Sequence, residues 1–321
     1  MKATTILVPL DGSPFAETAI PAAIGAANRL HAAIDFVSVF DDASIMAGTE
    51  LTAQNFKDWL SGYLKEVVTR TKGLVEGDVT FTIVDGTPVE RLVEYAKRSQ
   101  VELIVMSTHG RGIISRAWLG SVADRLVRHV DIPVMLVRTS EDESEPVLEN
   151  LTELKPKKIL VPLDGSALAE QSVAWAMRFS DSHQAQLILV RAVEQPIPFT
   201  SAYLPHAVED THKALAWATE NAQGYLTDIQ AALAKQGVDV AVEVLEGVHP
   251  ARGMEVYVQE HGVDMIVMAS HGRTGLARAF LGSVADKVIR HSEIPVLLVR
   301  PDPKEEARIS HAQEEAHAGH G

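Results

Sequence analysis

The sequence predicts an α/β protein built from two copies of one domain, each a five-stranded parallel sheet with helices on both faces. Three observations support this fold class. Residues 109–138 and 271–300 are nearly the same sequence, with 19 of 30 positions identical. A second repeated run, residues 5–13 and 158–166, lies near the start of each half. Strand-like and helix-like runs alternate between these landmarks, a pattern typical of a parallel sheet with right-handed crossovers.

The elements of the first half follow from local patterns of apolar residues. Ser13 is a candidate N-cap, and Pro14 fits the first position of a helix. The run Leu103–Ser107 shows no polar alternation, as expected for a strand that is covered on both faces. In chain order we expect strand Ile6–Leu10, helix Pro14–Leu30, strand Ala33–Phe40, helix Asn55–Leu74, strand Val79–Val84, helix Val89–Arg98, strand Leu103–Ser107, helix Ser121–His129 and strand Val134–Arg138.

The offset between the two halves changes along the chain. Asp11 corresponds to Asp164, an offset of 153, whereas Gly120 corresponds to Gly282, an offset of 162. Nine additional residues therefore lie within the second half, and we place them around residues 194–212. A period of this length indicates a duplicated domain rather than a solenoid repeat. The expected organisation is a first domain 1–140, an acidic linker 141–156, a second domain 157–301 and a disordered tail 302–321.

Composition excludes several classes of protein. The formal net charge of −14 argues against general nucleic-acid binding, which requires a basic face. No apolar run is long enough for a membrane span, and the N-terminus lacks the pattern of a signal peptide. The chain has no cysteine, so disulfides and thiolate metal sites are excluded. We therefore expect a cytoplasmic protein with no membrane partner.

A glycine-containing loop follows the fourth strand of each half. Gly110 is followed after nine residues by Gly120 and Ser121, and the second half repeats this spacing. Glycine lets the backbone approach an anion closely, and a Gly-Ser helix start presents unpaired N–H groups at the positive end of the helix dipole. The alternative interpretation is that Gly-Ser is only a good helix start. Two copies at identical spacing favour a phosphate-binding site in each half.

Asp11 and Asp164 each follow the first strand of a half. If the strand order is 3-2-1-4-5, strands 1 and 4 are neighbours, and ligands bind beyond their carboxyl ends. Asp11 would then face the loop that begins after Ser107. The alternative is that Asp-Gly-Ser forms a turn and a helix cap, and the two roles can coexist.

With these motifs, the two halves resemble the universal stress protein domain, a flavodoxin-like or Rossmann-like fold. Nucleotide-binding members of that family carry Gly-x2-Gly-x9-Gly-[Ser/Thr] after the fourth strand. The resemblance implies that the first-strand Asp and the end of the second strand hold adenosine, and that the glycine loop holds ribose and phosphates. Transferred by position, the implied site residues are Pro9, Asp11, Val39, Met106, Ser107, Gly110, Gly120, Ser121 and Val122 in the first half, and Pro162, Asp164, Ala192, Met268, Ala269, Gly272, Gly282, Ser283 and Val284 in the second.

Both halves depart from the family pattern at one position. The first glycine of the motif is Ser107 in one half and Ala269 in the other. A Cβ at this position would crowd a ribose that lies on the backbone, so we expect weakened rather than abolished binding. Arg111 and Arg273 follow the next glycine and could reach a phosphate, or they could be exposed loop cations.

His109 and His271 precede the glycine of each loop, and neither has an obvious nucleophile partner in the sequence. A hydrogen bond that orders the loop is the favoured interpretation for both, with a general-base role as the alternative. In the helix that follows each loop, Asp124 and Arg128, and likewise Asp286 and Arg290, are spaced as helix-surface ion pairs.

The resemblance implies a stress-response protein that binds an adenine nucleotide (ATP, ADP or AMP), with or without Mg²⁺, for regulation or protection. The sequence offers no convincing general base, nucleophile or two-metal carboxylate cluster, so we expect at most slow ATP hydrolysis. The wider group of ATP-pyrophosphatases carries Ser-Gly-Gly-x-Asp-Ser after the first strand. This chain has Leu-Asp-Gly-Ser at that position, which argues against adenylate-forming chemistry. A nucleotide-independent scaffold or chaperone is the remaining alternative.

The fifth strand of each half would leave an open sheet edge. Family members commonly dimerise through this strand, so a tandem chain is expected to pair its own two fifth strands as an internal pseudo-dimer. Association of two chains into a homodimer is a further option.

Overall fold

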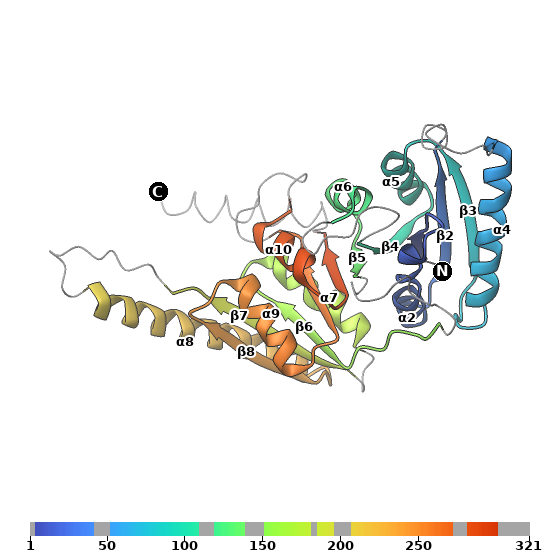
Figure 1. Ribbon diagram of the computed structural model, residues 1–321. Coiled ribbons are helices and arrows are strands. Elements are labelled where there is room, and N and C mark those ends of the chain that lie inside the picture. The colour runs from blue at the N-terminus through green and yellow to red at the C-terminus, as the bar shows by residue number, and fades with distance from the viewer. Residues whose placement is uncertain are drawn as a thin grey trace, which may run out of the picture. The chain divides into compact units, whose positions relative to one another are not determined.

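A computed structural model describes residues 4–41, 52–108, 119–138, 151–180, 185–195, 207–271 and 281–300 (Figure 1). Several predictions from the sequence lie outside these residues and receive no structural account. They concern His109, most of the expected linker, the expected tail, and the loop residues Gly110, Arg111, Gly272 and Arg273.

The first repeat alternates strands and helices as predicted. Its strands are all parallel and lie in the order β3-β2-β1-β4-β5. This is the 3-2-1-4-5 order expected from the sequence. The elements are β1 (Thr5–Pro9), α1 (Pro14–Glu17), α2 (Ile20–Leu30), β2 (Ala33–Phe40), α4 (Ala53–Thr71), β3 (Val79–Asp85), α5 (Pro88–Arg98), β4 (Val101–Ser107), α6 (Ser121–His129) and β5 (Val134–Val137).

The helix predicted over residues 14–30 is instead two helices, α1 and α2, which is a correction to the sequence analysis. Pro21 is the second residue of α2, and it has no N–H to donate to the carbonyl of Glu17. Between the two helices, Thr18 Oγ1 donates to the carbonyl of Phe15 at 2.7 Å. The break lets α1 end as a single turn directly after the first strand.

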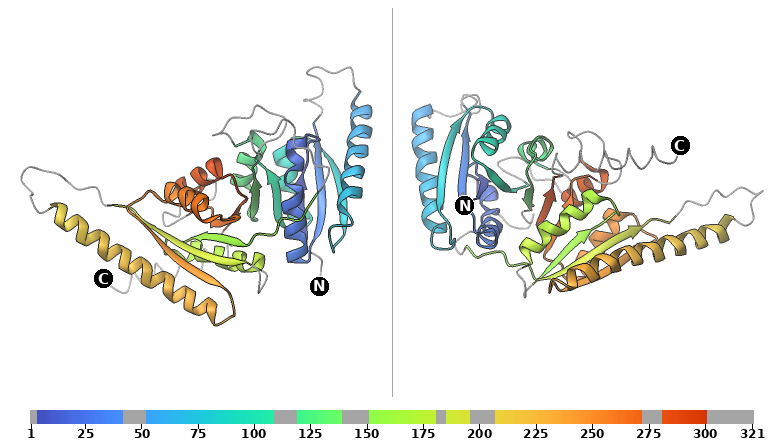
Figure 2. Two further views of the ribbon diagram at one scale, coloured as in Figure 1. Left: turned by 60° about the horizontal axis from the view of Figure 1, so that its bottom comes forward. Right: turned by 180° about the vertical axis from the view of Figure 1, so that it is seen from behind.

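The second repeat has the same architecture, with strand order β8-β7-β6-β9-β10, so the predicted fold class is confirmed. Its long helix α8 begins at Ala207, whereas the residue that corresponds to the start of α4 is Leu215. The additional residues thus lengthen this helix at its N-terminal end, which extends beyond the strands in Figure 2. The elements are β6 (Lys158–Pro162), α7 (Ala167–Phe179), β7 (Gln186–Val193), α8 (Ala207–Ala234), β8 (Val240–Glu246), α9 (Pro250–His261), β9 (Met265–Ala269), α10 (Ser283–His291) and β10 (Val296–Val299).

Helices cover both faces of the first sheet. Arg70 of α4 contacts Glu17 of α1, and Asn28 of α2 donates to the carbonyl of Leu74 just after α4, so these helices share one face. Helices α5 and α6 pack on each other over the opposite face. The central residues of β1, such as Leu7, are fully buried as a result. This burial explains why the central strands are apolar without alternation.

The chain clusters into two compact units. The first contains the residues up to Lys155 together with Ile289–Leu298, and the second begins at Pro156. Within the first unit, β10 runs antiparallel to β5, with Val296 opposite Leu136. The last strand of the second repeat thereby closes the edge that β5 would leave open, as the predicted internal pseudo-dimer requires.

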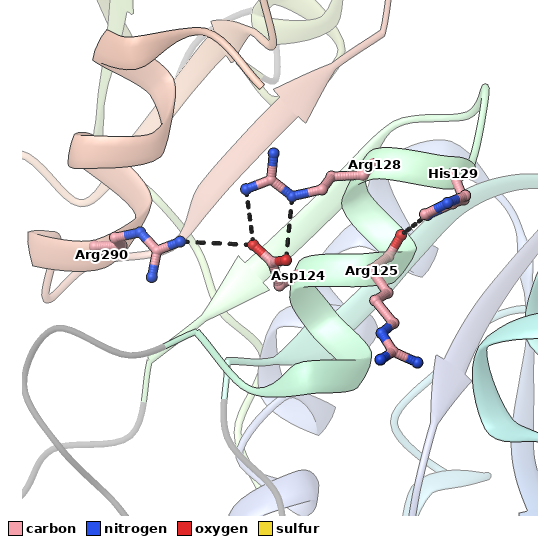
Figure 3. A network of polar contacts seen from close by, with 5 residues as sticks. All are labelled: Asp124, Arg125, Arg128, His129 and Arg290. Atoms are coloured by element: carbon pink, nitrogen blue, oxygen red, sulfur yellow. Dashed lines mark hydrogen bonds and ion pairs between the residues drawn. The ribbon is translucent and has the colours of Figure 1, made fainter. Parts of the chain in front are cut away.

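Charged groups accompany this strand pair inside the first unit. Arg128 donates to both carboxylate oxygens of Asp124 at 3.0 and 3.1 Å, which makes the predicted helix pair a bidentate one. Arg290 of α10 lies 3.6 Å from the same carboxylate (Figure 3). Arg138, just after β5, donates to the carbonyl of Arg290. One acidic group thus holds two arginines from different repeats.

No helix in the described ranges is both long and apolar enough to cross a membrane.

Candidate functional site

The Asp-Gly-Ser turn after the first strand is the same in both repeats. In the first, Asp11 Oδ1 accepts hydrogen bonds from Ser13 N at 2.9 Å and Ser13 Oγ at 2.6 Å. Ser13 Oγ in turn accepts from Ala16 N at 3.2 Å and caps α1. The second repeat reproduces these three bonds at the same distances around Asp164. The turn-and-cap interpretation of this motif is therefore present in the structure.

Glycine is required inside each turn. Gly12 has a φ of 82° and Gly165 a φ of 86°, a conformation that side-chain-bearing residues rarely adopt. The aspartate in front of each glycine is thereby held at the carboxyl end of the first strand. Both aspartates are partly exposed there, so their side chains stand at the surface of the sheet edge.

The end of the second strand lies beside this turn. Leu10 N donates to the carbonyl of Val37 at 3.0 Å, and Ser38 Oγ donates to the carbonyl of Leu10. Pro9 is paired with Val37 in the sheet register. The candidate residues Pro9, Asp11 and Val39 are therefore gathered at one edge of the sheet. Leu163 N makes the matching bond to Val190 in the second repeat, which places Pro162, Asp164 and Ala192 in the same way.

The end of the fourth strand leads to a helix start that lacks a side-chain cap. Gly120 N donates to the carbonyl of Thr108 at 2.8 Å, and the carbonyl of Gly120 accepts from Asp124 N at 2.9 Å. Helix α6 then begins at Ser121 with no side-chain hydrogen bond at its N-cap. The backbone pattern recurs in the second repeat between Gly282, Ser270 and Asp286. A serine side chain caps α1 and α7. At the start of α6, in contrast, no N-cap side chain accepts a hydrogen bond from the first N–H groups of the helix.

The two positions that depart from the family glycine are small and buried. Ser107 is 5 % exposed at the end of β4, and Ala269 is 8 % exposed at the end of β9. Met106 and Met268, the preceding candidates, are buried as well. The first and fourth strands of each repeat are parallel neighbours. These residues therefore lie at the same end of the sheet, its carboxyl end, as Asp11 and Asp164. Val122 and Val284 follow the serines that open α6 and α10.

A tyrosine and a glutamate recur at equivalent positions of the two repeats, and the sequence analysis missed both. Tyr225 of α8 donates its hydroxyl to Glu170 of α7 at 2.9 Å. Burial, the hydrogen bond to Glu170 and the negative charge of that residue raise the pKa of Tyr225. Burial and Glu17 likewise raise the pKa of Tyr63, with a further contribution from Asp11. The signal was available, because Tyr63 and Tyr225 are 162 residues apart and Glu17 and Glu170 are 153 apart, the two offsets of the repeat.

The cations near these pairs differ between the repeats. In the first, Arg70 of α4 lies 2.7 Å from the buried Glu17. The residue 162 positions later is Ala232, so the second repeat has no arginine at this place. There, Arg191 of β7 lies over the ring of Tyr225, with its guanidinium carbon 5.0 Å from the ring centroid. The equivalent residue of the first repeat is Ser38.

His271 makes a hydrogen bond with the side chain of the residue before it, and the loop that follows lies outside the described residues, so loop ordering stays a prediction. Its Nδ1 lies 3.0 Å from Oγ of the buried Ser270. Burial lowers the pKa of His271, and the positive charge of Arg300 adds to this effect. Both effects disfavour the charged imidazolium form. Among the described residues, no group of three or more His, Cys, Asp or Glu side chains is arranged to hold a metal ion.

Fold and site together define a protein with two doubly wound α/β domains, each with a candidate anion site at the carboxyl edge of its sheet. The chain matches the model of the Universal stress protein family twice, at residues 2–138 and 155–300. It therefore belongs to the universal stress protein family.

Individual relatives agree with this assignment. Universal stress protein MJ0531 of Methanocaldococcus jannaschii is 32 % identical over 149 residues, which are 46 % of this chain and 85 % of that protein. Universal stress protein Mb2019 of Mycobacterium bovis is 23 % identical over 323 residues, covering 92 % of this chain and 94 % of that protein. The crystal structure of a universal stress protein from Archaeoglobus fulgidus has a TM-score of 0.67 at 17 % identity and covers 94 % of this chain and 97 % of its own, which shows the same fold.

Proposed function

We propose that each domain binds an adenine nucleotide at the carboxyl edge of its sheet. In this proposal the Asp-Gly-Ser turn and the end of the second strand hold the adenosine. The start of α6 or α10 holds the phosphates, together with the loop residues Gly110, Arg111, Gly272 and Arg273. ATP, ADP or AMP, with or without Mg²⁺, is the ligand, and the role is stress-linked regulation or protection in the cytoplasm. The binding domains are residues 1–140 and 157–301.

The observation that carries the proposal is the helix start that lies next to the Asp-Gly-Ser turn. Helix α5 also lacks a side-chain cap, but it follows the outer strand β3, whereas α6 follows β4, the neighbour of β1. Helices α1 and α7 are capped by a serine side chain, whereas α6 begins after a glycine with no side-chain cap. An uncapped helix start presents N–H groups and about half a positive charge to a ligand. The strand before α6, β4, lies next to β1, and the turn of Asp11 follows β1 at the same end of the sheet. Donors for phosphate and an acceptor for a ribose or base are thus supplied together.

The small residues Ser107 and Ala269 tune this site. Each is buried at a strand end, where a ribose would lie against the backbone. A Cβ adds volume there, so binding weaker than in a site with glycine is expected. Both residues are small enough to leave the edge accessible. Substitution of each by glycine should strengthen binding.

The first part of the test measures whether nucleotide binds and at what stoichiometry. Titration calorimetry with ATP should give two sites per chain. Ser121→Glu and Ser283→Glu each add a carboxylate at the first position of a helix, where acidic residues favour the helix but repel a phosphate. Each single variant should retain one site, and the double variant should retain none. Each single variant also serves as the matched control for the other.

The second part of the test identifies the natural ligand. The purified protein is denatured, and small molecules that are released are analysed by mass spectrometry. Adenine nucleotide in this fraction supports the proposal. An empty fraction together with no heat at millimolar ATP would overturn it and would favour a nucleotide-independent scaffold. If the native protein, incubated with ATP, slowly produces ADP and phosphate, it hydrolyses the bound nucleotide weakly.

A further inference from the structure

A groove in the second domain is lined by α8 and by the last residue of β8. Helix α8 lies beside this strand (Figure 2). The groove has a volume of about 680 Å³, and its α8 lining extends for about 18 Å along the helix axis. A Cβ at Gly224 would meet no other atom within 4 Å, so the groove is open there. The lining includes Ala216, Thr219, Glu220, Gly224, Asp228 and Glu246.

The groove is acidic and its charge is not balanced. Glu220, Asp228 and Glu246 contribute carboxylates, and the lining holds no lysine or arginine. Within the described part of the chain, none of these three carboxylates forms an ion pair. The Oγ1 atom of Thr219 is buried in the same lining and has no hydrogen-bond partner among the described residues. Such a set of groups favours an occupant that is cationic and donates hydrogen bonds.

The first repeat shows how a cation occupies the equivalent place. Thr219 corresponds to Lys57, at the offset of 162, and the sheet register matches Glu246 with Asp85. Lys57 Nζ lies 2.5 Å from Oδ1 of Asp85 and 4.4 Å from the ring centroid of Phe40. A lysine of α4 thus neutralises in the first repeat the acidic position that stays without an ion pair in the second.

The two repeats share the acids of this surface but not its lysines. The acidic pairs at equivalent positions are Asp58 and Glu220, and Glu66 and Asp228. Thr227, another residue of the groove lining, stands where the first repeat has Lys65. Both lysines of the first repeat are therefore threonines in the second, and the carboxylates around them remain. The second repeat has the negative half of this charge pattern and lacks the positive half.

From this comparison we propose that the groove docks a basic segment of a partner protein. A lysine or arginine of that segment takes the place that Lys57 fills in the first repeat. The carboxylates are spread along the groove, which suits a segment with several cationic side chains better than one small cation. Trp217 is 69 % exposed, and helical spacing puts it on the same face of α8 as Glu220 and Gly224. An exposed tryptophan beside carboxylates is a good contact for lysine and arginine side chains.

Two features of the chain support this choice of occupant. The formal net charge of −14 means that a second copy of the chain would meet the acidic groove with like charge. The lining contains none of the candidate nucleotide-binding residues, so the inference does not depend on the proposed function. Its failure and the failure of nucleotide binding are separate results.

The test uses the full chain and a fluorescent peptide of about twelve residues in which lysine alternates with alanine, long enough to span the groove. The same peptide with glutamine in place of lysine is the ligand control. Fluorescence anisotropy at roughly 50 mM salt measures binding, because low salt preserves contacts between exposed charges. The emission of Trp217 should change when the lysine peptide binds, and Trp217→Phe should remove that change although three other tryptophans remain.

The decisive variant places the lysine of the first repeat in the groove. Thr219→Lys should pair with Glu246, keep the melting temperature of the wild type or raise it, and abolish binding of the lysine peptide. Gln236→Lys is the matched control, because it adds the same charge at an exposed position just after α8. It should change the affinity less than about twofold.

A second pair of variants removes charge instead of adding it. Glu220→Gln with Asp228→Asn should weaken binding of the lysine peptide about fivefold. Asp58→Asn with Glu66→Gln makes the same change at the equivalent positions of the first repeat and should leave the affinity near that of the wild type. This comparison tests the proposal even if Thr219→Lys were to unfold.

Four results would overturn the proposal. The first is no binding of the lysine peptide to the wild type, and the second is equal affinity of the Thr219→Lys and Gln236→Lys chains for it. The third is spermidine binding as tightly as the peptide, which would assign the groove to a small polycation. The fourth is dimerisation of the wild type in analytical ultracentrifugation that Thr219→Lys abolishes, which would assign the groove to a second copy of the chain.

Discussion

Arg70 Nη2 lies 2.7 Å from Oε2 of Glu17, and the glutamate side chain is only 11 % exposed. This ion pair joins α4 to α1, the short helix that follows the turn of Asp11. The negative charges of Glu17 and Asp11 both raise the pKa of the Tyr63 hydroxyl, after the larger effect of burial. The first candidate site therefore rests on a buried carboxylate whose charge is balanced by a single helix residue.

Arg70→Leu should destabilise the protein by about 2 kcal/mol, because it leaves Glu17 charged and buried without its partner. The value lies below that of a fully buried pair, since Arg70 is 31 % exposed. Urea unfolding monitored by circular dichroism measures the change. Arg98→Leu removes an arginine from an exposed pair with Glu94 and should cost less than about 0.5 kcal/mol. Equal costs for the two variants would show that burial of Glu17 is not what matters.

Stability should fall steeply above pH 10, partly through Tyr63. Burial and Glu17 raise its pKa in the folded state above the ordinary value of about 10. The contribution of the neutral tyrosine is thus fully present below pH 10, and it is lost as the pH rises toward the folded-state pKa. Tyr63→Phe should flatten the fall in the free energy of unfolding by about 1 kcal/mol per pH unit.

Urea unfolding at several pH values between roughly 8 and 11 measures this slope. Tyr257→Phe is the control. The pKa of Tyr257 is also raised by burial, but Tyr257 stacks on His261 at the far end of α9, away from the Asp-Gly-Ser turn. It should change the slope less than Tyr63→Phe. An identical slope in wild type and Tyr63→Phe would show that the hydroxyl of Tyr63 ionises normally.

Asp124→Asn should destabilise the first compact unit by about 1 kcal/mol at low salt. The carboxylate accepts a bidentate bond from Arg128 and lies near Arg290, and the loss of its charge weakens both contacts. All three side chains are about 30 % exposed or less, so salt screens them partly. Thermal unfolding at low and at roughly 0.5 M salt should show a smaller difference from wild type at high salt. A difference that does not depend on salt would contradict an electrostatic role.

Much of the fold could be predicted because the signals are local. Strands such as β4 are apolar without alternation, and helix starts such as Ser13-Pro14 carry their caps in adjacent residues. The exception, the break between α1 and α2, has a local cause in Pro21, but the helical spacing of apolar residues continues across it. Periodicity alone therefore predicts one helix where the backbone forms two.

The candidate site could be predicted only in part. The Asp turn and the Gly-Ser helix start are contiguous motifs, and the duplication of the chain marks both. Glu17 and Tyr63 are separated by more than forty residues, and a search for motifs does not join them. Comparison of the two offsets would have found them, because each residue recurs with the offset of its own part of the repeat.

The sequence by itself determined the duplicated α/β fold, because repeated motifs and apolar periodicity are encoded in neighbouring residues, and it predicts a candidate site in each domain. Only the tertiary structure decided that the two sites differ. Arg70 and Arg191 stand at unrelated positions of the repeat, yet folding brings each to the tyrosine–glutamate pair of its own domain. Long-range packing sets which arginine lies beside the tyrosine or the glutamate of each domain, because residues of separate helices and strands meet only in the folded domain.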